Sequence, residues 1–223
     1  MNHTLTTLFA LAFACTTAAS HAEEVTGDAQ AGGQKNAMCI GCHGIVGYQS
    51  TFPQVYKVPK ISGQGAGYIA AVLHEYKKGE RKHPTMRGVA DSLSDQDIAD
   101  VAAYYAQSGS TGTTLAPAPS APAPAPSAPV AALLQKGACV SCHGANFAQP
   151  IAPTYPQIAG QHADYLFVAL KAYKSQKNAY VGRSNPLMGA VAQQFSNTEL
   201  KALADYIGAL PGDLKVVPQS RFR

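Results

Sequence analysis

The sequence predicts an all-α protein built from two copies of one small domain. Three observations carry this prediction. A set of short motifs occurs twice in the same order, about 100 residues apart. Apolar residues recur at helical spacing in both halves, without the alternation typical of strands. A segment rich in Pro and Ala separates the two halves.

The first 22 residues have the features of a secretory signal peptide. An apolar run at residues 8–14 is followed at residues 20–22 by Ser-His-Ala, a cleavage site of small residues. This segment contains no Lys or Arg, so a buried N-terminal helix remains an alternative, as does a lipid on Cys15 that would tether the protein to a membrane. We expect residues 1–22 to be removed during export to the periplasm.

Charge is low and unevenly distributed. Hydrophobic residues make up 46% of the chain and charged residues 13%, as in a soluble globular protein. Residues 23–109 hold nine acids and eight bases, whereas residues 130–223 hold four acids and nine bases. So mild an excess of positive charge, without a basic helix, argues against nucleic acid. It favours a protein partner with an acidic surface.

The repeated motifs keep their order while their spacing drifts by a few residues, as expected for a duplicated domain with small loop insertions. The pairs are Cys39-Ile-Gly-Cys42-His43-Gly44 with Cys139-Val-Ser-Cys142-His143-Gly144, Pro59-Lys-Ile-Ser-Gly-Gln64 with Pro156-Gln-Ile-Ala-Gly-Gln161, and Met86 with Met188.

The repeat predicts domains at residues 23–109 and 130–223, joined by a linker at 110–129. Alternating Pro and Ala in the linker favour extended polyproline II. At ~3.1 Å per residue, such a segment can reach on the order of 60 Å. The two domains can therefore either dock or swing independently, and the sequence leaves both arrangements open.

Each copy is predicted to hold three helices and long loops. The first helix runs from about residue 29 to 39, and from about 131 to 139 in the second copy. A middle helix presents the apolar stripe around Tyr68 and Tyr165. The last helix begins at a capping box, which is Ser94-x-x-Asp97 in one copy and Ser196-x-x-Glu199 in the other.

Cys-x-x-Cys-His is a signature of covalent haem attachment. The two thiols form thioethers with the vinyl groups of one porphyrin, and the adjacent imidazole binds the iron. A zinc site, a thioredoxin-like redox pair and a structural disulfide are the alternatives, but none explains a His directly after each pair. The sequence therefore predicts two covalently bound haem c groups, attached through Cys39 and Cys42 with His43, and through Cys139 and Cys142 with His143.

Met86 lies 43 residues after His43, and Met188 lies 45 residues after His143. Each Met follows a Pro in a predicted loop, and we expect each to bind the opposite face of the haem iron. Thioether ligation raises the reduction potential, which suits a carrier of single electrons. A role in core packing is the alternative for both, and His83 is a competing ligand in the first copy.

The order of these motifs resembles that of class I cytochromes c, and its doubling in one chain resembles the dihaem cytochrome c4 family. The resemblance covers about residues 27–108 and 131–211. It implies that the Pro59 and Pro156 carbonyls accept hydrogen bonds from the two His ligands. It also implies a periplasmic electron carrier, without substrate chemistry of its own, that delivers electrons to a terminal oxidase.

Two other functions fit the same motifs. One is a haem-bearing subunit of a dehydrogenase complex, such as a flavocytochrome, and the other is a dihaem peroxidase with an open iron face.

Basic residues precede each Met and are interpreted either as a docking ring for an acidic partner or as solvated helix ends. They are Lys77, Lys78, Arg81 and Lys82 in the first copy, and Lys171, Lys174, Lys177 and Arg183 in the second.

Overall fold

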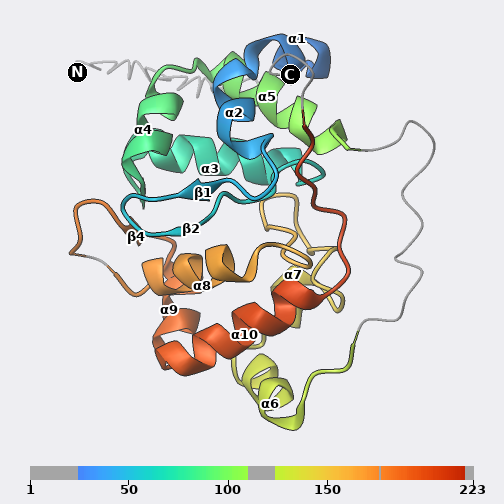
Figure 1. The fold of residues 1–223 in the computed structure, drawn as a ribbon, viewed down its shortest axis with the longest axis vertical. Helices are drawn as coiled ribbons and strands as arrows, with labels where there is room; N and C mark the ends of the chain where they lie inside the picture. The colour runs from blue at the N-terminus through green and yellow to red at the C-terminus, as the bar shows by residue number, and fades with distance from the viewer. Residues whose placement is uncertain (1–24, 110–123, 176, 219–223) are drawn as a thin grey trace, which may run out of the picture.

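The computed structural model describes residues 25–109, 124–175 and 177–218. The predicted signal peptide, Cys15 and most of the predicted linker lie outside these ranges. The described residues form two helical domains stacked one on the other (Figure 1). The prediction of an all-α protein with two domains is confirmed, and the strands are only two residues long each.

The N-terminal domain is built around its last helix, which packs against the first and third helices. Its elements are α1 (Ala29–Lys35), α2 (Ala37–His43), β1 (Gln49–Ser50), β2 (Tyr56–Lys57), α3 (Ala66–Lys78), β3 (Arg81–Lys82), α4 (Pro84–Asp91) and α5 (Asp95–Gln107). Ile98 and Val101 of α5 are almost fully buried in the core.

The C-terminal domain repeats this plan, with its last helix packed against the helix that corresponds to α3. Its elements are α6 (Ala128–Lys136), α7 (Val140–His143), α8 (Ala163–Ala172), β4 (Gly182–Arg183), α9 (Pro186–Gln193) and α10 (Asn197–Ala209). Leu200 and Ala204 of α10 are fully buried. Helix α6 begins at Ala128, so its first two residues lie in the segment assigned to the linker.

Each domain holds five described helices, so the prediction of three was wrong. The predicted first helix breaks at Asn36, whose buried side chain and backbone angles separate α1 from α2. In the second domain the break falls at Gly137 and Ala138, and Ala138 has a φ of 46°. The segments after Pro84 and Pro186 are helices rather than loops, because each Pro stands at the start of a helix, where its missing N–H costs nothing.

Both capping boxes are present, as predicted. The Ser94 side chain accepts from the Asp97 N–H, and the Asp97 carboxylate accepts from the Ser94 N–H. Ser196 and Glu199 make the same pair of bonds at the start of α10. Two unpaired backbone donors are satisfied at each helix start, which fixes where the last helix of each domain begins.

Helices α1 and α5 approach closely at Gly32, where a Cβ atom would collide with the Asp100 backbone. The Asp100 carboxylate, whose side chain is 3% exposed, accepts from the Asp28 N–H at 2.8 Å and from Lys35 Nζ at 2.7 Å. These bonds hold the pKa of Asp100 below its ordinary value, the Asp28 N–H contributing most. One buried carboxylate therefore ties α1 to α5.

The two domains are docked. Strand β3 pairs with β4 in antiparallel register, which places Arg81 opposite Arg183. Beyond α10 the chain runs back along the N-terminal domain (Figure 1), where the Lys215 N–H donates to the Ser62 carbonyl at 2.9 Å. The side chains of Gln64 and Gln161 also cross between the domains.

Several of the basic residues before each Met have contacts within the protein, so the eight do not act together as a docking ring. Arg81 is 4% exposed, with its guanidinium over the rings of Tyr68 and Tyr76 and an ion pair to Glu75 at 3.0 Å. Partly buried Arg183 lies over two Tyr rings in the same way.

Two of the lysines are also held within their own domain. Lys77 Nζ donates to the Leu93 carbonyl at 2.6 Å, and Lys174 Nζ donates to the Phe195 carbonyl at the same distance. At least four of the eight residues therefore have structural contacts. Within the described ranges, no helix is both long and apolar enough to cross a membrane.

We predict that Asp100→Asn destabilises the protein at pH 7, because it removes the charge paired with Lys35. The folded-state pKa of Asp100 lies below the unfolded value of about 3.9, so its contribution is present above that pH and lost as the pH falls through the folded value. Urea unfolding curves give the free energy of unfolding, and its difference between variant and parent should shrink toward low pH. The exposed pair Lys201–Asp205 offers a control, since Asp205→Asn should change little. A difference that stays constant with pH would contradict the prediction.

Candidate haem sites

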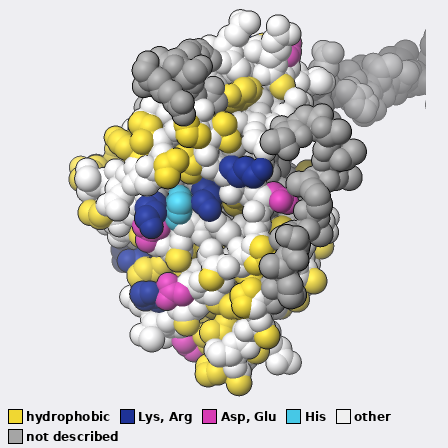
Figure 2. Space-filling view, turned by 45° about the vertical axis from the view of Figure 1, so that its right-hand side comes forward, with side chains coloured by type: hydrophobic (Ala, Val, Ile, Leu, Met, Phe, Trp, Pro, Cys, Tyr) yellow, Lys and Arg dark blue, Asp and Glu magenta, His cyan; other side chains and the backbone are white. Residues whose placement is uncertain are grey.

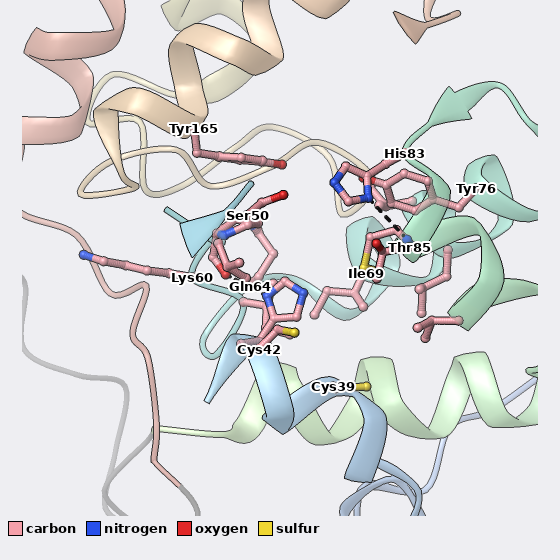
Figure 3. Close-up of a pocket in the computed structure, with 18 of the residues that line it drawn as sticks. Cys39, Cys42, Ser50, Lys60, Gln64, Ile69, Tyr76, His83, Thr85 and Tyr165 are labelled. Atoms are coloured by element: carbon pink, nitrogen blue, oxygen red, sulfur yellow. Dashed lines mark hydrogen bonds between the residues drawn. The ribbon is translucent and has the colours of Figure 1, made fainter. Parts of the chain in front are cut away.

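Helix α2 places Cys39, Cys42 and His43 at the wall of one cavity. Cys39 and Cys42 are three residues apart, so both lie on one face of the helix. In Figure 3 the two thiols are seen on α2 at the lower side of the cavity. The helix thus presents two thiols and an imidazole to the same space.

The ring of His43 is held by the backbone of a distant loop. Its Nδ1 atom lies 2.8 Å from the Pro59 carbonyl oxygen. A carbonyl can only accept, so Nδ1 carries the proton and Nε2 is left with its lone pair. Burial lowers the pKa of His43, which keeps the ring neutral at pH 7. The imidazole is therefore oriented and in the protonation state that binds a metal.

The C-terminal domain repeats the arrangement around α7. Cys139 directly precedes the helix, and Cys142 and His143 lie within it. His143 Nδ1 lies 3.1 Å from the Pro156 carbonyl oxygen, and burial lowers the pKa of His143. Both Pro residues thus lie where the resemblance places them, as hydrogen-bond acceptors for the His beside the second Cys.

The four motif cysteines form no disulfide with one another. Burial raises the pKa of the Cys39 thiol to about 11, and burial likewise raises the pKa of Cys139. A thioredoxin-like redox pair requires the opposite, a thiol with a lowered pKa. Among the described residues, no three His, Cys, Asp or Glu side chains gather as a metal cluster.

Met86 lies in the first turn of α4 and lines the same cavity as His43. Its N–H donates to Nδ1 of His83, the N-cap residue of α4, at 3.3 Å. In the second domain the Met188 N–H donates to the Asn185 side chain at 3.0 Å. His83 is therefore the counterpart of a capping Asn, and the bond that it accepts is seen in Figure 3.

The cavity of the N-terminal domain has a volume of about 330 Å³, within the range of about 300–1,000 Å³ for ligand sites. Apolar side chains line most of it, including Ile69, Leu73 and Val101. Two thiols, an imidazole with a free Nε2 and a thioether converge on this apolar space. This donor set fits a haem attached through two thioethers, with one axial ligand from each side.

Residues of the C-terminal domain also line this cavity. They are Pro156, Gln157, Ile158, Gln161, Tyr165 and Leu166. Figure 3 shows Tyr165 reaching the cavity from the opposite domain. The sequence did not place these residues at the N-terminal cavity, because nothing in the local pattern shows that the domains dock. The one available signal was the repeated Gly-Gln at the end of the Pro-x-Ile motif.

A family model described as cytochrome c matches residues 29–108 and 127–211. Cytochrome c4 of Pseudomonas aeruginosa is 33% identical over 192 residues, which cover 82% of this chain and 89% of that protein. The chain belongs to the dihaem cytochrome c4 family. The crystal structure of reduced recombinant cytochrome c4 from Pseudomonas stutzeri matches with a TM-score of 0.58 and 30% identity, over 83% of this chain and 100% of that one.

A thiosulfate dehydrogenase electron acceptor from Thiomonas intermedia is also similar. It is 30% identical over 182 residues, which cover 78% of this chain and 79% of that protein. Membership of the cytochrome c4 family confirms the prediction of two covalently bound haem c groups, one at each Cys-x-x-Cys-His motif. It makes the protein an electron-transfer cytochrome whose partners are redox proteins.

We predict that the double variant Cys39→Ala/Cys42→Ala carries one haem per chain. A domain of this size buries little apolar surface, so the N-terminal domain should lose most of its helicity when its cavity has no haem. Pyridine haemochrome quantification and far-UV circular dichroism measure the two effects. Gly41→Ala is the matched control within the same motif, because a Cβ there meets nothing within 4 Å. Two haems or full helicity in the double variant would contradict the prediction.

Proposed function

We propose that this protein is a periplasmic carrier that takes single electrons from one redox protein and passes them toward a terminal oxidase. The observation that carries the proposal is the docking of two haem domains, with residues of one domain lining the haem cavity of the other. Such a unit can accept an electron on one side and release it on the other. The cytochrome c4 relatives support a carrier without substrate chemistry of its own.

The axial ligands that we propose are His43 and Met86 for the first haem, and His143 and Met188 for the second. His43 and Met86 line the same cavity, which supports the first pair. The order of helices and the capped turn around Met188 repeat those around Met86, which supports the second. We also keep the proposed domains at residues 23–109 and 130–223, and the export signal at 1–22.

The haem iron, when bound, supplies reversible one-electron reduction. The residues of this chain set the conditions for it. The Pro59 and Pro156 carbonyls orient the imidazoles and increase their basicity. With both the His and the Met bound, the iron would have no open coordination position for oxygen or peroxide. The apolar lining keeps water from the site, which favours a high potential because the charged form is poorly solvated.

Basic side chains at the surface favour an acidic partner. On the face shown in Figure 2, Lys and Arg form a band across the middle of the molecule, with a His among them. Burial lowers the pKa of His162 most; nearby Lys60 and Lys57 lower it further, while Asp164 raises it. A surface of this kind steers a partner of opposite charge toward the boundary between the domains.

A second candidate is the electron acceptor of a dehydrogenase. It is favoured by the similarity to a thiosulfate dehydrogenase electron acceptor over 78% of this chain. Both candidates use the same haem sites, and they differ in the donor. Stable co-purification with a catalytic subunit, and fast reduction by it, would favour this second function over a freely diffusing carrier.

We predict that Met86→Leu opens one iron face without removing a haem. The near-infrared charge-transfer band of Met-ligated iron should fall by about half, since one of two sites is lost, and the reduced variant should bind carbon monoxide. Met38→Leu is the control, since Met38 is 53% exposed. An unchanged band in Met86→Leu would contradict the assignment of Met86. Rapid carbon monoxide binding by the parent protein would favour a peroxidase.

A further inference from the structure

Gln64 and Gln161 end the repeated Pro-x-Ile-x-Gly-Gln motifs, and both are 4% exposed. Each side chain crosses the boundary between the domains and binds the residue that follows the Pro in the other copy of the motif. The two residues differ by 97 positions, as do their targets Lys60 and Gln157. The contact is therefore reciprocal, and it follows the internal symmetry of the molecule.

Each glutamine amide makes two hydrogen bonds to one backbone residue. Gln161 Oε1 accepts from the Lys60 N–H and Gln161 Nε2 donates to the Lys60 carbonyl, both at 2.9 Å. Gln64 Oε1 accepts from the Gln157 N–H at 3.0 Å, and Gln64 Nε2 donates to the Gln157 carbonyl at 2.9 Å. Lys60 Nζ adds a bond to the Gly160 carbonyl at 2.7 Å.

These bonds continue the one made by each His. The Lys60 N–H and the Pro59 carbonyl belong to the same peptide group, and that carbonyl lies 2.8 Å from His43 Nδ1. A chain of hydrogen bonds therefore runs from the His43 ring through one peptide group to Gln161 of the other domain. The second chain runs from His143 through the Pro156 carbonyl and the Gln157 N–H to Gln64.

A peptide group that donates through its N–H is polarised, and its carbonyl becomes a stronger acceptor. A stronger acceptor at Nδ1 makes the imidazole a more basic iron ligand. Hydrogen bonding around the ligands is one of the means by which a protein sets a haem potential. A more basic ligand stabilises the oxidised iron, so the glutamine lowers the potential of a haem that its own domain does not carry.

We propose that Gln64 and Gln161 are positioning residues that act in trans, each tuning the axial His of the other domain. The proposal rests on the proposed ligation of iron by His43 and His143. It follows that docking itself sets the potentials, because separation of the domains breaks both chains. If the two glutamines only held the domains together, they would make the same contacts. A substitution of one glutamine would then have no selective effect on the His of the other domain.

The test is Gln161→Met, which keeps the side-chain length and removes both hydrogen bonds to Lys60, together with the one that Gln161 Oε1 accepts from the His162 N–H. In reduced, ¹⁵N-histidine-labelled holoprotein, the Nδ1–H resonance of His43 should move upfield, and that of His143 should stay in place. In a redox titration followed by the NMR signals of each haem, the equilibrium constant for reduction of the N-terminal haem should rise by about threefold. Gln64→Met should give the mirror result at His143 and the C-terminal haem.

Tyr180→Leu is the matched control. The Tyr180 ring packs edge to face against Phe52 of the other domain. This variant therefore weakens the interface without changing a residue of either chain of hydrogen bonds. It should leave both His resonances unchanged, and small-angle X-ray scattering should show all variants docked. The proposal is overturned if each Gln→Met variant shifts the His of its own domain, shifts both equally, or shifts neither. If the parent protein lacks the Met charge-transfer band or His ligation, the proposed ligands are overturned instead.

Discussion

The hydrogen bond between each His and a Pro carbonyl is the contact on which the rest of the structure depends. It fixes the imidazole, and in the N-terminal domain it holds the Pro-x-Ile-x-Gly-Gln segment at the wall of the haem cavity. The same segment then supplies the peptide group and the glutamine that join the two domains. One short stretch of chain therefore serves the iron ligand, the cavity wall and the interface.

This shared use explains why the domains are docked despite a linker long enough to let them separate. The contacts between them include hydrogen bonds to backbone groups, the pairing of β3 with β4, and the ring contact of Tyr56 with Tyr165. The N–H and carbonyl groups that bind the two glutamines belong to the backbone of the motif. The motif itself therefore supplies both sides of these contacts between the domains. The result is a molecule in which residues of the C-terminal domain form part of the wall of the N-terminal haem cavity.

Much of this could be predicted from the sequence, because the signals are local. The two Cys-x-x-Cys-His motifs and the capping boxes at Ser94 and Ser196 depend on spacings of three or four residues. The break at Asn36 was missed, because a buried Asn that ends a helix has no marker in the surrounding pattern. Docking was left open, because its contacts join residues about 100 positions apart. Arg81 is buried rather than at the surface, because its guanidinium packs over the rings of Tyr68 and Tyr76, which a pattern of basic residues does not reveal.

Docked domains hold the two haems as one fixed relay, and the rate of electron transfer between them tests this most directly. After rapid reduction of one haem in the full-length holoprotein, the electron should redistribute to the other with a first-order rate constant. That constant should be independent of protein concentration and unchanged when glycerol raises the viscosity of the solvent, because docked domains need no movement. A rate constant that falls in proportion to viscosity would show that the domains must first swing together, and would contradict a fixed relay.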